Sequence, residues 1–305
     1  MEIKTVSIIG LGALGMGFGE LLLRNMPKEN LRIVADEARI KRYKEQGIYV
    51  NGKPCDFNYI TPEETGKPAD LLIFMVKSNQ LQNAIKDARN QVGKNTIIMS
   101  ALNGITSEEI IGEAYGMENM LYCVAQGQDG IKEGNQLNYH NMGMLCFGDG
   151  EPGIISDKTK AVANFFEKVN FPHQVDADMV RRIWGKFMLN VGVNQTVAVY
   201  EGTYGDIQKP GQARDTMVNA MREVLALSEK VGVKLSENDL NYWLKVVDAL
   251  NGSGMPSMRQ DMAAKRLSEV ELFSGTVLKL GQKYNVPTPV NQRLYEKITQ
   301  VESQY

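Results

Sequence analysis

The chain has 305 residues, of which 43% are hydrophobic and 23% are charged, and its formal net charge is −2. A single hydrophobic core stops growing at about 250–300 residues, so we expect two domains. The composition, with 34 basic against 36 acidic residues and no apolar run long enough to span a bilayer, argues against nucleic acid or a membrane as a partner.

The first predicted element is a β-branched strand over residues 5–9, which leads through three glycines into a helix over residues 13–23. Glycines at this spacing are the fingerprint of a dinucleotide-binding loop, because they permit a tight turn, close approach of a pyrophosphate and close packing of the helix. The helix N-terminus then offers unpaired N–H groups to the phosphates. A glycine turn with a purely structural role is the alternative. The residues predicted to bind the cofactor here are Gly10, Leu11, Gly12, Ala13, Leu14 and Gly15.

A second strand over residues 31–35 ends at Asp36, 21 positions after Gly15. An acidic residue at this place bonds the ribose hydroxyls of NAD, whereas an arginine accommodates the 2′-phosphate of NADP. Asp36 therefore favours NADH. Two alternatives stay open: Asp36 as the N-cap of the next helix, and Arg39 or Arg42 on that helix as partners of a phosphate.

The pattern up to residue 175 predicts a Rossmann-type, doubly wound sheet. Residues 47–60 are expected to form a strand-and-turn excursion with Asn51-Gly52 as a hairpin turn. A helix over residues 156–169 has Ser156 as its N-cap. Further strands are expected over residues 69–76, 96–99, 120–125, 137–140, 144–147 and 171–175. The fourth and fifth of these are expected to be antiparallel additions joined by residues 141–143.

Polar residues follow two of the central strands. Lys77 comes directly after the apolar run that ends at Val76, and Asn103 follows the strand over residues 96–99. Ligands bind open α/β sheets at the carboxyl ends of the strands. We therefore expect Lys77 and Asn103 to contact a ligand at this edge.

From about Asp176 the pattern changes to long helices, which predicts an all-helical second domain over residues 176–305. The helices are expected over residues 178–200, 212–232, 236–250, 257–283 and 291–303. Methionine-rich faces on these helices are compatible with a homodimer. The three cysteines are scattered and the two histidines have no ligand spacing, so we expect a reducing, cytoplasmic location without disulfides or a metal site.

The first of these helices places Lys186, Asn190 and Asn194 one above another on a single face. The residues around them are almost all apolar or small. A buried lysine is costly unless it is paired or used, and two amides in line with it offer donors and acceptors to a small polar ligand. The alternative is a solvent-exposed polar stripe on an otherwise buried helix.

These motifs together resemble the ketopantoate reductase family, also called the 2-dehydropantoate 2-reductases, and the resemblance spans nearly the whole chain in the right order. The motifs are Gly10-Leu11-Gly12-Ala13-Leu14-Gly15, Val76-Lys77, Asn103-Gly104, Trp184-x-Lys186-x3-Asn190-x3-Asn194, Pro256-Ser257-Met258-x2-Asp261 and Glu269. The implied helical domain is like the C-terminal domain of 6-phosphogluconate dehydrogenase.

The resemblance implies a role for each matching residue. Lys186 matches the catalytic lysine that protonates the keto oxygen, and Glu269 matches the acid that holds substrate and lysine in place. Asn190 and Asn194 match substrate-binding asparagines, and Ser257 matches the serine that binds the substrate carboxylate. Two other readings stay open: Glu269 on the solvated face of a long helix, and Ser257 as a helix N-cap.

Three positions depart from the family pattern. Asp36 stands where the family usually has an arginine for the 2′-phosphate, so either NADH or NADPH remains a candidate cofactor. Gly254 replaces an asparagine often found a few residues before the serine. Tyr204 replaces another, in the turn after the lysine helix. The last two changes leave the exact 2-keto acid open.

The resemblance implies the reduction of 2-dehydropantoate to pantoate by a reduced nicotinamide, in the pathway to pantothenate and coenzyme A. A lysine ammonium suits this chemistry, because hydride transfer to a ketone builds negative charge on its oxygen. One alternative is a reductase of another branched 2-keto acid. A second is a non-catalytic protein that senses the nucleotide, for which a proton donor would have no use.

Overall fold

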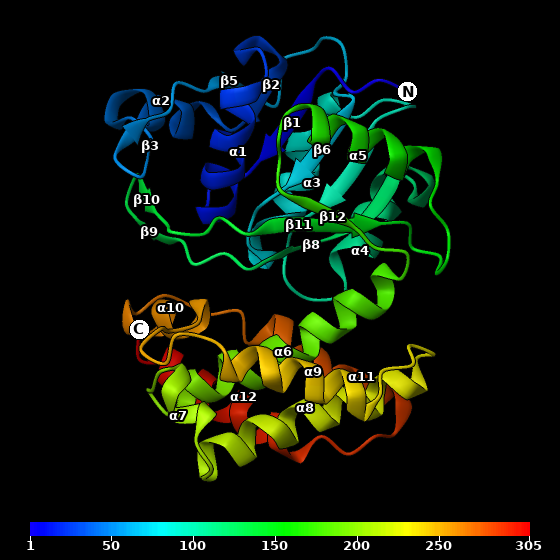
Figure 1. Ribbon diagram of the computed structural model, residues 1–305. Helices are drawn as coiled ribbons and strands as arrows, with labels where there is room; N and C mark the ends of the chain where they lie inside the picture. The colour runs from blue at the N-terminus through cyan, green and yellow to red at the C-terminus, as the bar shows by residue number, and fades with distance from the viewer. The chain divides into compact units, whose positions relative to one another are not determined.

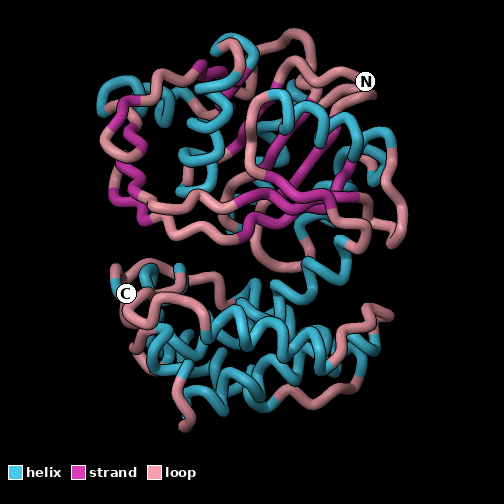
Figure 2. The backbone as a smooth tube through the Cα atoms, in the orientation of Figure 1, coloured by secondary structure: helices cyan, strands magenta, loops and turns pink.

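The computed structural model describes all residues 1–305 and divides into two compact units, Met1–Val180 and Arg181–Tyr305. The first unit is α/β (Figure 1), and the second contains only helices and loops (Figure 2). This confirms the predicted fold class. The sequence pattern changes at Asp176, shortly before helix α6 (Met179–Val199), which carries the chain from the first unit into the second.

An eight-stranded sheet forms the centre of the first unit, in the order β12-β11-β8-β7-β6-β1-β2-β5. Its strands run in parallel from β8 to β5, while β11 is antiparallel to β8 and β12 is parallel to β11. The strands are β1 (Val6–Ile9), β2 (Leu31–Val34), β5 (Asn58–Ile60), β6 (Leu71–Phe74), β7 (Ile97–Ser100), β8 (Met120–Gln126), β11 (Met144–Gly148) and β12 (His173–Val175).

Helices cover both faces of this sheet, because side chains alternate between two apolar cores. Ile8 and Ile73 face the core that contains α1 and α5, while Ile9 and Phe74 face the core that contains α3 and α4. Ser156 caps α5 through the N–H of Thr159, as predicted. The helices are α1 (Ala13–Asn25), α2 (Glu37–Gln46), α3 (Leu81–Ala88), α4 (Ser107–Tyr115) and α5 (Asp157–Lys168), with short 3₁₀ turns η1 (Lys28–Asn30), η2 (Ser78–Gln80), η3 (Arg89–Gln91) and η4 (Met117–Asn119).

A separate four-stranded sheet corrects one prediction. Its order is β4-β3-β10-β9, with β3 (Tyr49–Val50), β4 (Lys53–Pro54), β9 (Ile131–Glu133) and β10 (Gln136–Asn138). The hairpin at Asn51-Gly52 is confirmed, and both residues have positive φ angles. The expected joint addition of residues 137–140 and 144–147 is wrong, because β10 pairs with β9 and β3 while β11 joins the large sheet.

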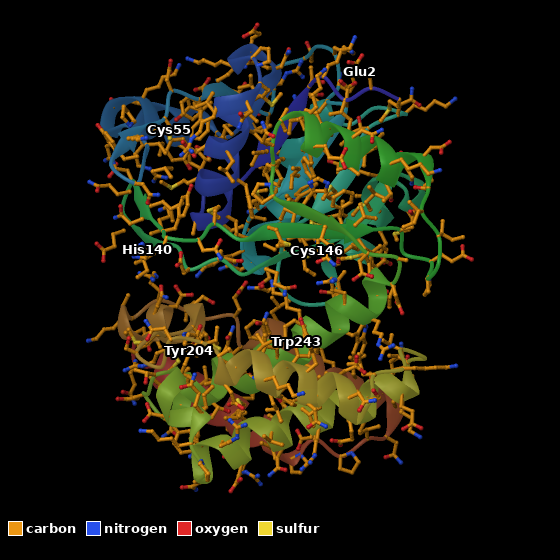
Figure 3. The ribbon with its side chains drawn as sticks, in the orientation of Figure 1. Glu2, Cys55, His140, Cys146, Tyr204 and Trp243 are labelled. Atoms are coloured by element: carbon orange, nitrogen blue, oxygen red, sulfur yellow. The ribbon has the colours of Figure 1, made fainter.

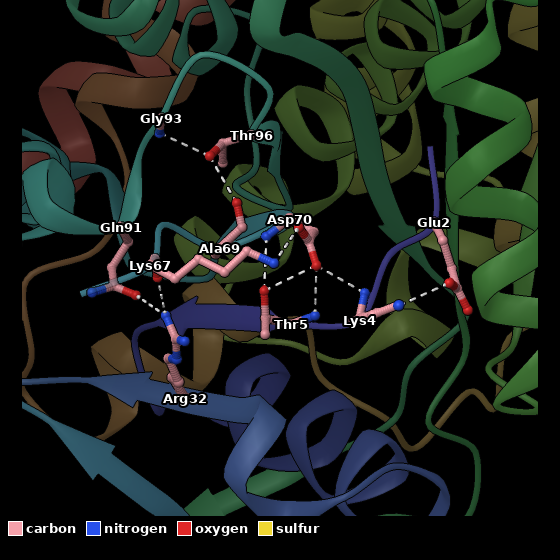
Figure 4. Close-up of polar contacts among 10 residues, drawn as sticks. All are labelled: Glu2, Lys4, Thr5, Arg32, Lys67, Ala69, Asp70, Gln91, Gly93 and Thr96. Atoms are coloured by element: carbon pink, nitrogen blue, oxygen red, sulfur yellow. Dashed lines mark hydrogen bonds and ion pairs between the residues drawn. The ribbon is translucent and has the colours of Figure 1, made fainter.

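The amino ends of the central strands are held together by a closed polar network (Figure 4). The carboxylate of Asp70 accepts the N–H groups of Lys4 and Thr5, each at 2.9 Å, and the Thr5 hydroxyl at 3.1 Å. The Thr96 hydroxyl donates to the carbonyl of Ala69 and accepts the N–H of Gly93. These contacts join the start of β1 to the starts of β6 and β7.

The second unit packs around helix α8 (Gln212–Lys230), which contacts α7 (Tyr204–Gln208), α9 (Glu237–Asp248), α11 (Thr276–Tyr284) and α12 (Pro289–Glu302). Two further elements are α10 (Ser257–Ala263) and a turn of π-helix, η5 (Glu271–Gly275). The predictions over residues 212–232, 236–250 and 291–303 are confirmed to within a few residues. In the whole chain, no helix combines the length and the apolar character that a membrane span requires.

The single helix predicted over residues 257–283 is wrong. Helix α10, seven residues long, ends after about two turns because Lys265 adopts a left-handed conformation, with φ of 51°. The N–H of Lys265 bonds the carbonyl of Met262, and the N–H of Arg266 bonds that of Asp261. This is a Schellman ending formed without glycine. Glu269 therefore lies in an irregular segment between α10 and η5, and not on a long solvated helix.

Candidate active site

The glycine loop has the geometry that its spacing predicts. Gly10 has a φ of 103°, and a Cβ there would lie 2.6 Å from the carbonyl oxygen of Met75. A Cβ on Gly15 would lie only 1.8 Å from the carbonyl oxygen of Gly10, so the close packing of α1 requires glycine. A Cβ on Gly12 would meet only one atom, at 3.8 Å. The second glycine thus leaves an open face on the loop.

Gly12 is also the N-cap of α1, and no side chain caps this end of the helix. The first-turn residues Ala13, Leu14 and Gly15 therefore direct backbone N–H groups at the open face of the loop. Uncapped N–H groups and a positive dipole end are suited to a pyrophosphate. The residues present fit the phosphates of a dinucleotide.

Asp36 lies just beyond the end of β2 and caps helix α2. Its carboxylate accepts the N–H of Arg39 at 2.7 Å and forms an ion pair with the Arg39 guanidinium at 3.2 Å. Arg42 instead lies over the ring of Tyr43, 5.4 Å from its centroid. Because the Asp36 side chain remains about half exposed, it can cap the helix and still accept a hydroxyl group from a ligand.

Lys77 and Asn103 both follow carboxyl ends of neighbouring strands. Lys77 comes three residues after the end of β6 and directly before η2, and Asn103 lies in the loop between β7 and α4. The chain segment before Lys77 packs against the glycine loop, since a Cβ on Gly10 would lie 2.6 Å from the carbonyl oxygen of Met75. The strand order β7-β6-β1-β2 therefore places Asn103, Lys77, the glycine loop and Asp36 along one edge of the sheet.

A cavity of about 380 Å³ adjoins the glycine loop, but it shares only Leu11 with the predicted residues. Its other walls are the second half of α2 and the β9–β10 turn, with Arg42, Tyr43 and Lys132 among the lining residues. Neither Lys77 nor Asn103 lines this cavity.

In the second unit, two glycines determine how α6 is oriented. A Cβ on Gly185 would lie 2.7 Å from the indole nitrogen of Trp243 on α9, and one on Gly192 would lie 2.4 Å from Met221 on α8. These glycines are seven residues apart and share one helix face. At 3.6 residues per turn, the face of Lys186, Asn190 and Asn194 lies about 150° away from them. Packing on α8 and α9 therefore turns the polar face outward from those helices.

The polar face of α6 is not a solvent-exposed stripe. Asn190 and Asn194 are 9% and 7% exposed, and Lys186 is partly buried. The alternative of a purely solvated face is therefore wrong. A cation and two amides in a row provide donors to a ligand oxygen and acceptors to a ligand hydroxyl.

Ser257 is the first residue of α10 and its side chain is exposed. The expectation that it caps this helix is wrong, because Pro256 occupies the N-cap position and no side chain caps the helix. The fixed φ of proline and the extended conformation at Pro256 start the helix in place of a hydroxyl. The Ser257 hydroxyl is thus not used for capping.

Glu269 precedes a π-turn that is held by a buried network, which the sequence did not reveal. Its carbonyl accepts the N–H of Phe273 at 3.1 Å, at the start of the π-turn. Within that turn, Ser274 donates its N–H to the amide oxygen of Gln195 on α6 at 3.1 Å and its hydroxyl to Asn291 on α12 at 3.0 Å. All three residues of this network are fully buried. The one sequence feature that could have indicated this network is the presence of polar residues on otherwise apolar helix faces.

The loop before α10 is joined to the turn after α6. Tyr204 and Gly205 donate their N–H groups to the carbonyls of Gly254 and Gly252, at 3.0 and 2.8 Å. Burial raises the pKa of the Tyr204 phenol to about 12. Tyr204 and Gly254, two of the three positions at which the sequence departs from the pattern of the resemblance, are thus in direct contact.

Comparison with known proteins gives matches over most of the chain. Sequence models of ketopantoate reductase PanE/ApbA and of its C-terminal domain match residues 6–152 and 178–302. A 2-dehydropantoate 2-reductase of Streptococcus pyogenes serotype M6 is 26% identical over 299 residues, which cover 96% of each chain.

Solved structures share the fold. D-mandelate dehydrogenase in complex with NADH and anilino(oxo)acetate has a TM-score of 0.86 at 22% identity, covering 98% of this chain and 99% of that one. A dimeric ketopantoate reductase from Staphylococcus aureus has a TM-score of 0.77 at 19% identity, covering 98% and 99%.

The fold and the glycine loop define a nicotinamide-dependent oxidoreductase with a Rossmann-type domain and a helical domain. Within this class, the chain belongs to the ketopantoate reductase family.

Proposed function

We propose that this chain reduces 2-dehydropantoate to pantoate with a reduced nicotinamide dinucleotide, using Lys186 as the proton donor. The observation that carries the proposal is the single face of α6 that presents Lys186, Asn190 and Asn194, in a chain whose first unit has an open glycine loop. Membership of the family supports the same reaction.

The first unit would hold the cofactor. The N–H groups at the start of α1 face the pyrophosphate, Asp36 accepts the ribose hydroxyls, and Lys77 and Asn103 reach toward the nicotinamide end. When bound, the reduced nicotinamide supplies the hydride that reduces the keto carbon.

The second unit would hold the substrate and supply the proton. Lys186 donates a proton from its ammonium group to the keto oxygen, where negative charge develops, and solvent later reprotonates it. Asn190 and Asn194 hydrogen-bond the substrate, and the Ser257 hydroxyl binds its carboxylate. Glu269 accepts hydrogen bonds from the substrate or from Lys186 and keeps both in position.

The deciding experiment is Lys186→Met, which keeps much of the side-chain length and removes the ammonium group. We expect kcat to fall by about 10²–10⁴-fold, the usual range for loss of a general acid. The dissociation constant for the cofactor should stay unchanged, because Lys186 is assigned to the proton transfer and not to cofactor binding. Lys230→Met, at an exposed lysine on α8, is the matched control. Near wild-type kcat in folded Lys186→Met would show that the proton comes from elsewhere.

Asp36 would make NADH the preferred cofactor, because its carboxylate repels a 2′-phosphate and accepts ribose hydroxyls. Asp36→Ser keeps a side chain that can cap α2 and removes the charge. We expect the ratio of kcat/KM for NADH to that for NADPH to fall by about tenfold or more, which corresponds to about 1.4 kcal/mol. An unchanged ratio would instead point to Arg39 or Arg42 as the determinant.

Two further expectations accompany this proposal. A homodimer through the helical unit is expected to have about twice the 34.0 kDa mass of the chain, and light scattering after size exclusion measures this mass directly.

The competing function is a nucleotide sensor without catalysis. Binding of the cofactor with no reduction of any 2-keto acid would favour that sensor over the reductase.

A further inference from the structure

The loop between β7 and α4, residues 101–106, leaves the carboxyl edge of the sheet close to the glycine loop. Its first residue, Ala101, donates its N–H to the carbonyl of Phe74 at the end of β6, at 2.9 Å. The residue after Phe74 is Met75, whose carbonyl oxygen a Cβ on Gly10 would meet at 2.6 Å. Direct contacts thus connect the glycine loop to this loop across two strand spacings, or about 10 Å.

The strand order assigns this side of the sheet to one half of the cofactor. Strands β2 and β5 lie on one side of β1, and β6, β7 and β8 lie on the other, so the order reverses between β1 and β6. A dinucleotide lies across such a crevice, and the acidic residue that bonds its adenosine ribose follows the strand after the glycine loop. That strand is β2, which leads to Asp36. The nicotinamide half would therefore lie over the ends of β6 and β7.

A series of hydrogen bonds joins the two ends of the loop. Leu102 donates its N–H to the hydroxyl of Ser100 at 3.4 Å, and Ser100 donates this hydroxyl to that of Ser107 at 2.8 Å. The Ser107 hydroxyl in turn donates to the carboxyl group of Glu108 at 2.9 Å. Ser100 is the last residue of β7 and Ser107 is the first of α4. We call Ser100, Ser107 and Glu108 the loop clamp, because together they close the loop around Asn103.

Glu108 is the acceptor at the end of the loop clamp. Its own N–H and that of Cys123 on β8 also hydrogen-bond its carboxyl group. Cys123 lies opposite Phe147 of β11, next to Cys146, which Figure 3 labels. Glu108 is only 3% exposed. One buried carboxyl group thus joins the end of β7, the start of α4 and β8.

The loop clamp does not serve as an ordinary helix cap. Thr106 occupies the N-cap position of α4, and no side chain caps the helix there. A buried carboxyl group is costly unless its acceptors are used, and those of Glu108 are directed at Ser107 and β8. Between the two ends, residues 103–106 are only half-buried, and Gly104 has a positive φ of 93°. Anchoring at both ends therefore determines the conformation of this loop.

Building on the proposed function, we propose that Glu108 is a positioning residue for the nicotinamide half of the cofactor, because through Ser107 and Ser100 it holds the loop of Asn103 in the conformation that the cofactor contacts. Glu108 itself touches no ligand. Without the loop clamp, the cofactor has to order the loop when it binds, and this ordering weakens binding. The glycine loop and Asp36, which hold the other half, are unaffected.

The test compares two ligands that differ in the nicotinamide. ADP-ribose contains the adenosine, the pyrophosphate and the second ribose of NADH but no nicotinamide, and calorimetric titration gives both dissociation constants. Ser107→Ala interrupts the loop clamp and leaves Glu108 with its two N–H donors, whereas Glu108→Leu removes the final acceptor. For both variants we expect the Kd for NADH to rise about three- to tenfold, the usual effect of one hydrogen bond. The Kd for ADP-ribose should stay unchanged.

Three further variants separate positioning from a general loss of structure. Glu108→Gln keeps an acceptor oxygen for Ser107 and should retain more affinity for NADH than Glu108→Leu does. Asn103→Ala should weaken NADH binding, and adding Ser107→Ala to it should cause no further loss, because the side chain to be positioned is gone. Glu109→Gln, at the exposed neighbour of Glu108 on α4, is the control.

The possible outcomes are distinct. An unchanged Kd for NADH in folded Ser107→Ala and Glu108→Leu overturns the inference, and so does equal weakening of NADH and ADP-ribose, which indicates a merely structural role. Turnover of 2-dehydropantoate is measured separately. The predicted pattern of binding without turnover of any 2-keto acid overturns the proposed reductase and supports the positioning role. If the wild-type chain binds neither NADH nor ADP-ribose, the cofactor site and this inference fail together.

Discussion

The two edges of the large sheet use polar groups in opposite ways. At the amino edge, Asp70, Thr5 and Thr96 satisfy one another and the neighbouring backbone, so the network is closed. At the carboxyl edge, the chain leaves β1 through a glycine loop whose helix end has no side-chain cap, and it leaves β2 toward the half-exposed Asp36.

This difference separates stability from function along the same strands. Hydrogen bonds closed within the chain at one edge join the start of β1 to that of β6, and the start of β6 to that of β7. At the other edge the glycine loop offers its N–H groups outward, and only Asp36 also serves the fold, as the cap of α2. Substitutions at the two edges should therefore differ in what they change, and the three predictions below test this from the largest effect to the smallest.

The sharpest contrast lies within the glycine loop itself. Gly15→Ala should destabilise the fold by about 3 kcal/mol or more, because its Cβ meets a backbone oxygen and α1 must move. Gly12→Ala should cost less than about 1 kcal/mol, the range for a changed N-cap, yet weaken dinucleotide binding at least tenfold. Urea unfolding and calorimetric titration with NADH measure the two effects. Equal loss of stability in both variants would contradict the division between packing and ligand contact.

Much of the fold could be predicted because it depends on local patterns. Successive apolar residues in β1 and β6 face two different cores, so each strand appears in the sequence as a nearly continuous apolar run. The predictions that were wrong concern strand pairing and helix ends, which tertiary contacts determine. Nothing in residues 137–147 indicates that β10 pairs with β3, which lies more than eighty residues earlier. Likewise, Lys265 ends α10 in a conformation that usually indicates glycine or asparagine.

The site was predictable where one element carries it and less so where several meet. The spacing of Lys186, Asn190 and Asn194 needs only helical geometry. The hydrogen bonds among Gln195, Ser274 and Asn291, in the elements that flank the Glu269 segment and α6, join three elements, and no local pattern shows them. The contact between Tyr204 and Gly254 is equally non-local, although each was noticed separately as an unusual residue.

One carboxyl group near the carboxyl edge of the sheet forms its hydrogen bonds within the chain, and it should make stability depend on pH. Glu108 is buried at the start of α4, and its carboxylate accepts the hydroxyl of Ser107, which also bonds Ser100 at the end of β7. Burial raises the pKa of Glu108 to about 7, and the Ser107 hydrogen bond opposes this only in part. The folded chain thus keeps a proton on Glu108 that the unfolded chain releases near its ordinary pKa of 4.5.

Stability from this group is fully present below pH 4.5 and is lost as the pH rises to about 7. The loss should reach about 3 kcal/mol, since each unit of pKa difference corresponds to about 1.4 kcal/mol. Glu108→Gln should remove this loss and be more stable than the wild type at pH 8. Glu113→Gln, an exposed position on the same helix, is the control. Urea unfolding at pH 5 and pH 8 gives the free energy of unfolding at each pH. The same change in this free energy between the two pH values for wild type and Glu108→Gln would contradict the assignment.

The closed amino edge gives the smallest predicted effect and the opposite dependence on pH. Burial of Asp70 tends to raise its pKa, but the N–H groups of Lys4 and Thr5 and the Thr5 hydroxyl outweigh this and lower the pKa below 3.8. Its contribution to stability is therefore present above pH 3.8 and is lost as the pH falls through the lowered value.

Asp70→Asn keeps one acceptor oxygen and loses the charge, so we expect a cost of about 1–2 kcal/mol at pH 7, the difference between charged and neutral hydrogen bonds. The cofactor dissociation constant should not change, because Asp70 lies at the far edge of the sheet from the glycine loop. Unfolding of Asp70→Asn and of the exposed control Asp56→Asn at pH 7 and pH 3 measures this, and the deficit of Asp70→Asn should shrink in acid. If Asp70→Asn weakened NADH binding as much as Gly12→Ala does, the two edges would be coupled and the separation of stability from function would fail.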